Sequence, residues 1–253
     1  MRGLKGKLII NTSAQSKAEK LKILLTKKEA EVINFPLISI QANIDNSQTI
    51  KQTLNSLSTY TWLVFTSTNG VKYFDYWVKH FQIDTKNLPC KYAAIGTSTG
   101  MALMELGYSA KFISNSKDSV EYGEELLTAF VGDNQKILVP AGNLASTSLQ
   151  NVLNKEQHCE YLIVYNTINN SEFEAELSTI VQSNKYDLIL FLSPSAVNSF
   201  VIQNRLTNLA EVKAVAIGKT TEKAMVEKGI NPVLTASTPN ANIMVTEIDE
   251  YFK

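Results

Sequence analysis

The sequence predicts an α/β protein made of two similar doubly wound lobes with mainly parallel sheets. Apolar runs of strand length alternate with segments of helical period along the chain, which is typical of strand–helix–strand units. The same order of segments also occurs twice. With 253 residues, 44% of them apolar, the chain is long enough to form two lobes with cores of their own.

The repeat is clearest in two pairs of segments. "VFTSTNGVKYF" at 64–74 corresponds to "LFLSPSAVNSF" at 190–200, and "AAIGTSTGMALMELG" at 93–107 corresponds to "VAIGKTTEKAMVEKG" at 215–229. Upstream, "KLIINTSA" and "EVINFPLISI" correspond to "KILVPAGN" and "EYLIVYNTI", mainly by spacing. Each copy is therefore predicted to form a strand, a helix and a strand, followed by a strand, a helix, a strand, a helix, a short strand and a helix.

Local signals indicate where several helices begin and end. Ser13, Ser67 and Ser193 each precede a helical segment, and serine is a preferred N-cap. Gly107 and Gly229 follow helical segments, where a left-handed glycine commonly ends a helix.

Several large side chains are expected to be structural. The pattern places Trp62 in a strand and puts Phe74 and Trp77 on the buried face of a helix. His80 and His158 flank polar segments and are expected at the surface.

Composition excludes several classes of protein. Lysine plus arginine equals aspartate plus glutamate at 24 each, so nothing favours a nucleic-acid partner. No apolar run approaches a membrane span, and the "LII" near the N-terminus is too short for a signal peptide. Cys90 and Cys159 have no companions at ligand spacing, so a metal site is not expected. We expect a cytoplasmic protein with reduced thiols.

The two lobes are expected to share a short hinge made of "FPLISI" at 35–40 and "VYNTI" at 164–168. A cleft between lobes is the usual ligand site, and doubly wound sheets bind ligands beyond the carboxyl ends of their strands. The turns predicted there hold hydroxyl and amide side chains, very few acids and no histidine. Helix N-termini with such side chains favour a ligand with several anionic groups. GxGxxG and GxxxxGK[ST] motifs are both absent.

Each candidate in these turns also has a structural interpretation. A serine or threonine at a helix start is most often a cap, but Thr99 and Thr221 lie three residues after a glycine, later than a cap is expected. For Thr99 and Thr221, a ligand contact and a structural role are equally well supported. Gly96 and Gly218 are expected in tight turns. Tyr165 follows an apolar run at the hinge, where a half-buried strand tyrosine is the commoner interpretation.

Taken together, several segments resemble the uroporphyrinogen-III synthase family over nearly the whole chain. They are "WLVFTSTNGVKYF", "YAAIGTSTGMALMELGY", "IVYNT", "LILFLSPSAVNSF" and "VAIGKTTEKAMVEKGINPVLTASTPNANIMVTEI". The resemblance implies two flavodoxin-like lobes joined by a two-stranded hinge, with the active site in the cleft between them. It also implies a discontinuous first lobe of residues 1–35 and 168–253, a second lobe of 39–164, and hinge strands at about 35–40 and 164–168.

The resemblance also implies an activity. The family closes hydroxymethylbilane, an open-chain tetrapyrrole with eight carboxylates, to uroporphyrinogen III with loss of water and inversion of ring D. It needs no metal or organic cofactor. Tyr165 matches a family tyrosine proposed to assist loss of the hydroxyl. Thr99, Thr221, Ser67 and Ser193 match family positions at the site, and the expected substrate-binding residues of the strand-end turns are Thr12, Ser67, Thr68, Gly96, Thr97, Thr99, Ser193, Gly218 and Thr221.

The sequence departs from the family in its arginines. Members often carry arginine in the turns that read "NTSAQSK" and "AGNLASTSLQ" here. Carboxylates would then be held by backbone donors, hydroxyls, and Lys17 or Lys219. This leaves open a non-catalytic homologue or a two-lobed binding protein for a polycarboxylate or tetrapyrrole ligand, while a twin-domain glycosyltransferase is less well supported. The expected partners are the substrate and, transiently, the enzyme that makes it, with no nucleic acid or membrane, and the expected state is a monomer.

Overall fold

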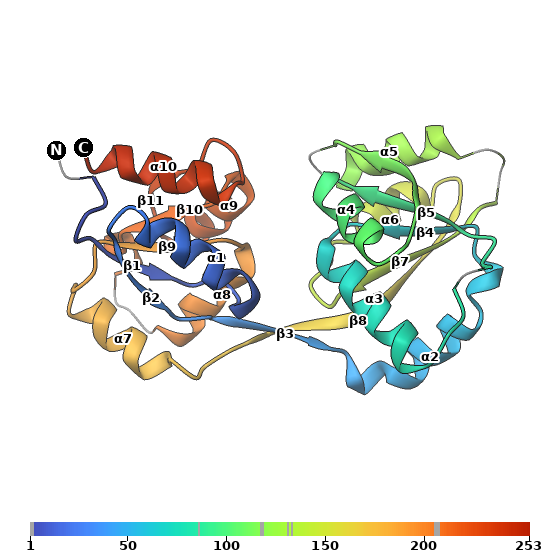
Figure 1. The fold of residues 1–253 in the computed structure, drawn as a ribbon, viewed down its shortest axis with the longest axis horizontal. Helices are drawn as coiled ribbons and strands as arrows, with labels where there is room; N and C mark the ends of the chain where they lie inside the picture. Colours follow the sequence, from blue (N-terminus) through green and yellow to red (C-terminus); the bar gives the residue numbers. More distant parts are fainter. Residues whose placement is uncertain (1–2, 86, 117–118, 131, 133, 205–207) are drawn as a thin grey trace. The chain divides into compact units, whose positions relative to one another are not determined.

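The computed structural model describes residues 3–85, 87–116, 119–130, 132, 134–204 and 208–253, without the side chains of residues 16 and 17. The chain forms two compact units (Figure 1). The first unit comprises Met1–Ile40 and Ile168–Lys253, and the second comprises Gln41–Thr167. The α/β class predicted from the sequence is confirmed.

The first unit is built on a five-stranded parallel sheet with the order β11-β10-β9-β1-β2. Its elements are β1 (Leu8–Asn11), α1 (Gln15–Thr26), β2 (Glu31–Asn34), α7 (Glu174–Gln182), β9 (Leu188–Phe191), α8 (Pro194–Gln203), β10 (Ala214–Ala216), α9 (Lys219–Glu227), β11 (Pro232–Thr235) and α10 (Ala241–Tyr251). This is the strand order of flavodoxin-like folds.

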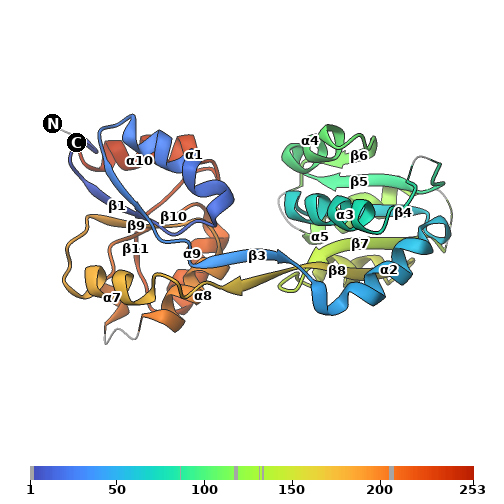
Figure 2. The ribbon, with the colours of Figure 1, turned by 60° about the horizontal axis from the view of Figure 1, so that its bottom comes forward.

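The second unit is built on a sheet with the order β3-β8-β7-β4-β5-β6, in which β8 to β6 are parallel. Its elements are β3 (Ile38–Ala42), α2 (Ser47–Asn55), β4 (Trp62–Phe65), α3 (Thr68–His80), β5 (Lys91–Ile95), α4 (Thr97–Glu105), β6 (Ala110–Ser114), α5 (Ser119–Ala129), β7 (Lys136–Gly142), α6 (Ser148–Leu153) and β8 (His158–Asn169). The chain enters this unit through β3 and leaves it through β8 (Figure 2).

The duplication seen in the sequence is visible in the strand order of the two sheets. The segment pairs match β4 with β9 and β5 with β10, and the weaker upstream pairs match β7 with β1 and β8 with β2. With these equivalences, β8-β7-β4-β5-β6 and β2-β1-β9-β10-β11 are the same arrangement. Apart from the added edge strand β3, the second unit therefore has the flavodoxin-like order, with β4 as the equivalent of the third strand coming first in the chain.

Helices cover both faces of each sheet. In the second unit, α2, α3 and α4 enclose one core and α5 and α6 the other. In the first unit, α7, α8 and α9 cover one face and α1 and α10 the other. All four residues of β4 and of β9 are buried, as expected for parallel strands that have both faces covered. Trp62, Phe74 and Trp77 lie in these cores, which confirms their structural interpretation.

Four of the five predicted helix ends are confirmed, those at Ser67, Ser193, Gly107 and Gly229, and the one at Ser13 is wrong. Gly107 and Gly229 follow the C-caps of α4 and α9 with φ of +86° and +82°, a region that favours glycine. Ser13 does not cap α1, because the N-cap is Ala14 and no side chain bonds there. Instead, the backbone N–H of Ser13 donates to Oδ1 of Asn11 at 3.1 Å.

Two further observations bear on the predicted class. No helix in the described ranges is long and apolar enough to cross a membrane. Cys90 and Cys159 are free and buried, as expected for reduced thiols. Burial raises the pKa of both thiols, that of Cys159 to about 12, so both stay protonated near neutral pH.

The carboxylate of Asp249 in α10 binds the N-terminal segment to that helix. Oδ1 of Asp249 accepts from the backbone N–H of Leu4 at 3.0 Å, and Oδ2 lies 3.1 Å from Nζ of Lys28 and 3.4 Å from Nζ of Lys253. These interactions lower the pKa of Asp249, the Leu4 hydrogen bond most of all. The charged carboxylate therefore stabilises the folded first unit.

We expect Asp249→Asn to lower the free energy of unfolding by about 1 to 2 kcal/mol near pH 7, since the donors of Leu4, Lys28 and Lys253 lose their charged partner. Because the folded pKa is lowered, this contribution is complete above the unfolded value of about 3.9 and is lost as pH falls towards the folded value. Calorimetry of both proteins between pH 7 and pH 3 measures it, and the difference should shrink below about pH 4. Glu250→Gln, an exposed carboxylate change on the same helix, is the control. A difference that grows on acidification would contradict the assignment.

Candidate functional site

The strand order of each sheet identifies a switch point, where neighbouring strands lead into connections that leave in opposite directions. In the second unit this point lies between β4 and β7, and in the first unit between β1 and β9. Ligands of doubly wound folds bind beyond the carboxyl ends of the strands at such points. The relevant turns are those that follow Phe65 and Gly142 in the second unit, and Asn11 and Phe191 in the first.

Two predicted serines occupy equivalent places in these turns. Oγ of Ser67 accepts from the N–H of Gly70 at 3.0 Å and caps α3, and Oγ of Ser193 accepts from the N–H of Ala196 at 3.3 Å and caps α8. Both serines are partly exposed. A capping hydroxyl uses a lone pair, so its proton stays available to a second acceptor. Oγ of Ser195 lies 2.9 Å from that of Ser193.

Helix α4 begins differently, at a glycine. Gly96 has φ of +75°, and no side chain caps the helix. Its first turn contains no acidic residue, and Thr97 there is exposed. Thr68, at the start of α3, is exposed as well. The unpaired N–H groups of a helix N-terminus attract anions, so this end of α4 suits a carboxylate.

The equivalent turn of the first unit departs from the expectation. Gly218 has φ of 173°, an extended conformation open to any residue, so the prediction of a tight-turn glycine is wrong here. Glu222 lies in the first turn of α9 and pairs with Lys219 at 2.9 Å. The hydrogen bond from Lys219 lowers the pKa of Glu222, so this N-terminus carries a charged carboxylate and is less suited to anions than that of α4.

Three of the predicted threonines are buried. Thr99 and Thr221 are each 3% exposed, on equivalent turns of α4 and α9. Thr12 is 0% exposed, and its hydroxyl donates to the carbonyl of Leu190 at 2.6 Å. That bond joins β1 to β9 and favours a structural role for Thr12. Lys17, the predicted cation of this turn, has a side chain outside the described part of the structure.

Tyr165 lies inside β8, beside the switch point of the second unit. Its ring is partly buried and stacks on that of Tyr73 from α3, with the centroids 5.4 Å apart and the planes inclined by 28°. Gly142, the last residue of β7, pairs with Tyr165 in the sheet. The N–H of Asn143 donates to the carbonyl of Tyr165 at 3.1 Å. The sequence pattern singled out Tyr165 but not Tyr73.

Burial raises the pKa of the Tyr73 hydroxyl, and the neighbouring phenols of Tyr165 and Tyr76 add to the effect, because adjacent phenolates would repel each other. Tyr73 is therefore a neutral neighbour of Tyr165 around neutral pH. The described residues contain no group of three or more His, Cys, Asp or Glu that could hold a metal ion. The chemistry offered by this edge is that of hydroxyls, phenols and backbone N–H groups.

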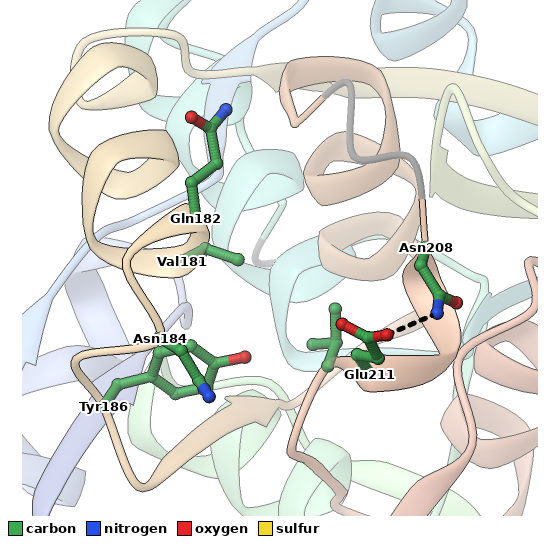
Figure 3. A pocket seen from close by; sticks show the side chains of 7 residues that line it. Val181, Gln182, Asn184, Tyr186, Asn208 and Glu211 are labelled. Carbon is green, nitrogen blue, oxygen red and sulfur yellow. Dashed lines mark hydrogen bonds between the residues drawn. The ribbon is translucent and has the colours of Figure 1, made fainter.

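Cavities lined by described residues also lie at the opposite edge of the sheets, and two of them are the following. One of about 220 Å³ is lined by Tyr186 and Val212, which precede β9 and β10 (Figure 3). Within it, Asn208 donates to Glu211 at 2.7 Å. The other, of about 810 Å³, lies around Cys90 at the start of β5. Because ligands of this fold bind at the carboxyl ends of the strands, neither is the primary candidate.

These features define a class of protein with two doubly wound α/β units whose carboxyl edges present hydroxyls and helix N-termini. A family model for uroporphyrinogen-III synthase HemD matches residues 19–246. The chain therefore belongs to this family, and the resemblance seen in the sequence is confirmed.

Known proteins agree with this assignment. The porphyrin biosynthesis protein HemD of Ruminiclostridium josui is 27% identical over 226 residues, which cover 87% of this chain and 44% of that protein. This chain thus spans less than half the length of that relative. A mutant uroporphyrinogen III synthase of the extremely thermophilic bacterium Thermus thermophilus (TM-score 0.71; 98% of this chain and 99% of that one) and the uroporphyrinogen-III synthetase of Helicobacter pylori (TM-score 0.60; 98% and 100%) share the fold at 17% identity.

We expect Ser67→Ala to lower the free energy of unfolding of the second unit by about 1 kcal/mol, because α3 loses its N-cap. Both tryptophans lie in this unit, so fluorescence during denaturant unfolding reports on it. Ser98→Ala, at an exposed position in α4 without a capping role, should change stability by less than about 0.5 kcal/mol. Ser67→Asp should retain most of the stability, since aspartate also caps. Equal losses in the alanine and aspartate variants would argue against the cap.

Proposed function

We propose that this protein is a uroporphyrinogen-III synthase, a lyase that closes hydroxymethylbilane to uroporphyrinogen III with loss of water and inversion of ring D. The observation that carries the proposal is the family match over residues 19–246, on a chain with the matching fold. We further propose that the protein acts in the cytoplasm as a monomer. Its partners would be the substrate and, transiently, the enzyme that supplies it.

The carboxyl edges of the two sheets support a polycarboxylate substrate. In the second unit, the uncapped N-terminus of α4 and the exposed hydroxyls of Thr68 and Thr97 offer hydrogen-bond donors without an acidic neighbour in the helix's first turn. In the first unit, the hydroxyls of Ser193 and Ser195 form a hydrogen-bonded pair at the start of α8, which leaves one of the two protons for a ligand. Donors of this kind bind carboxylates through several weak contacts rather than through one strong ion pair.

Arginine contributes little to the described part of either edge. The sequence contains two arginines, Arg2 and Arg205, and both lie outside the described residues. Lys219 is exposed but already paired with Glu222. The donors in the described part of the edges are therefore mainly neutral, and for these donors we expect affinity to depend less on salt than it would with an arginine-lined site.

Tyr165 is the proposed catalytic residue. In this role its phenol gives a proton to the departing hydroxyl, so that the carbon–oxygen bond breaks and water leaves. The resulting azafulvene is attacked by the substituted carbon of ring D, which leads through a spiro-pyrrolenine to the inverted product, and the proton released at the end returns to the tyrosine. General acid catalysis typically contributes about 10²- to 10⁴-fold.

The proposal is tested by identifying which uroporphyrinogen isomer the protein forms. Purified protein is incubated with freshly generated hydroxymethylbilane, the products are oxidised, and uroporphyrins I and III are separated by chromatography. We expect a large excess of isomer III over a heat-inactivated control. Isomer I alone, at the spontaneous rate, would exclude the synthase and leave a non-catalytic homologue or binding protein, which titration with the oxidised tetrapyrrole would then detect.

We expect Tyr165→Phe to lower kcat by about 10²- to 10⁴-fold if the phenol is the general acid, with a smaller change in KM. Tyr161→Phe is the matched control. Tyr161 lies in the same strand, and its hydroxyl donates to the carbonyl of Ser146 at 3.2 Å. The control should keep kcat within about twofold. An unchanged kcat in Tyr165→Phe would remove the acid role and leave the synthase assignment in place.

A further inference from the structure

The strand that carries Tyr165 contains an irregularity next to that residue. Strands β7 and β8 pair in parallel with Pro140 opposite Leu162 and Ala141 opposite Ile163, but Gly142 lies opposite Tyr165. Val164 is therefore an extra residue without a partner on β7, as in a β-bulge. Bulges redirect side chains and are frequent beside active sites.

The bulge changes the face on which Tyr165 lies. Side chains of a strand alternate between faces, and Tyr161 and Ile163 pack in the core formed with α5 and α6. Strict alternation would place Tyr165 with them. Instead, Tyr165 packs in the core formed with α3, together with Val164. One inserted residue thus moves the phenol to the α3 side of the sheet.

Two hydrogen bonds that the Val164 carbonyl accepts stabilise the bulge. The carbonyl oxygen of Val164 accepts from Nε1–H of Trp77 at 2.8 Å and from the backbone N–H of Asn43 at 3.2 Å. Trp77 is 0% exposed and lies one helical turn beyond Tyr73. Residues four apart on a helix share a face, so α3 holds both the bulge and the ring that follows it.

The Tyr165 ring lies between α3 and the end of β7. On one side it stacks on Tyr73, with the centroids 5.4 Å apart. On the other it covers Gly142, where an added Cβ would come within 2.4 Å of the ring and 2.8 Å of the phenol oxygen. A side chain at position 142 would therefore displace the ring, so glycine is required there by close approach rather than by its backbone angles.

We propose that Tyr73 and Gly142 are positioning residues, which hold the Tyr165 phenol over the end of β7 through the Val164 bulge. This inference rests on the proposed function, in which Tyr165 touches the substrate and the other two act through it. A misplacement of about 1 Å in a reacting group can lower a rate by about a hundredfold, so the two contacts should matter to kcat.

The first test compares variants at position 73. Tyr73→Ala should lower kcat for isomer III by about tenfold to a hundredfold and change KM by less than about threefold, because the phenol loses its orientation and the binding edges do not change. Tyr73→Phe keeps the stacked ring and should stay within about threefold of the unaltered protein. An unchanged kcat in Tyr73→Ala would overturn the proposal for this residue.

The second test uses a pair of glycines. Gly142→Ala should lower kcat in the same way. Gly123→Ala is the matched control: it lies in α5 on the other face of the same sheet, where an added Cβ would come within 2.8 Å of Val152. Both changes should cost stability, but only Gly142→Ala should lower kcat per folded molecule. Equal kcat values in the two variants would show a structural role alone.

The third test separates action through Tyr165 from any other action. In a Tyr165→Phe background the phenol is already absent, so Tyr73→Ala should cause no further loss of kcat. A loss of the same size in both backgrounds would overturn the proposal.

A final measurement does not depend on activity. In protein labelled with ¹³C in its tyrosine rings, the Tyr165 resonance, assigned by its absence in Tyr165→Phe, should shift in Tyr73→Ala and keep its place in Tyr76→Ala. A protein that makes isomer I alone but shows this shift would refute the synthase function and support the packing. An unshifted resonance would refute the positioning, whichever isomer forms.

Discussion

The parallel pairing of β7 with β8 is the constraint on which the candidate site depends. It brings the end of β7, with Gly142 and Asn143, beside Tyr165. It also attaches β8 to the sheet through β7, which itself pairs with β4. The pairing has one interruption, at Val164, whose carbonyl accepts from the indole N–H of Trp77 and from the backbone N–H of Asn43. A buried carbonyl needs a partner, so the indole that satisfies it also fixes where the strand bends.

The duplicated order of the sheets explains why hydroxyls recur at their carboxyl edges. Equivalent strands end in equivalent turns, so Ser67 and Ser193 cap equivalent helices, and Thr99 and Thr221 occupy equivalent first turns. The copies have nevertheless diverged in charge, because the first turn of α9 carries Glu222 and the first turn of α4 carries no acidic residue. The N-termini of α4 and α9 therefore differ in charge, and that of α4 is the more favourable for an anion.

Local patterns in the sequence predicted the fold class, the repeated elements, the caps at Ser67 and Ser193, and the left-handed glycines at 107 and 229. These features depend on neighbouring residues or on buried apolar runs. The failures depend on side-chain contacts that the local patterns do not show. Ser13 does not cap its helix, because its turn is organised by Asn11 and by a bond from Thr12 to β9. The sequence around Val164 contains no glycine or proline that would predict a bulge. The bulge depends on Trp77, which lies 87 residues away in the chain.

The packing around Tyr165 has a consequence for how such a site can change. A phenol that donates a proton must be held near its acceptor, and a strand residue on a regular ladder could be moved to the other face only by a shift of the whole strand. Here the redirection is confined to one position of the strand, where Val164 has no partner on β7, Trp77 binds its carbonyl, and Gly142 leaves room for the ring. The hydroxyls and helix N-termini at the edges can therefore vary with the substrate while the phenol stays in place. For the proposed substrate this separation is useful, because its carboxylates need many adaptable contacts and its leaving group needs one well-placed proton donor.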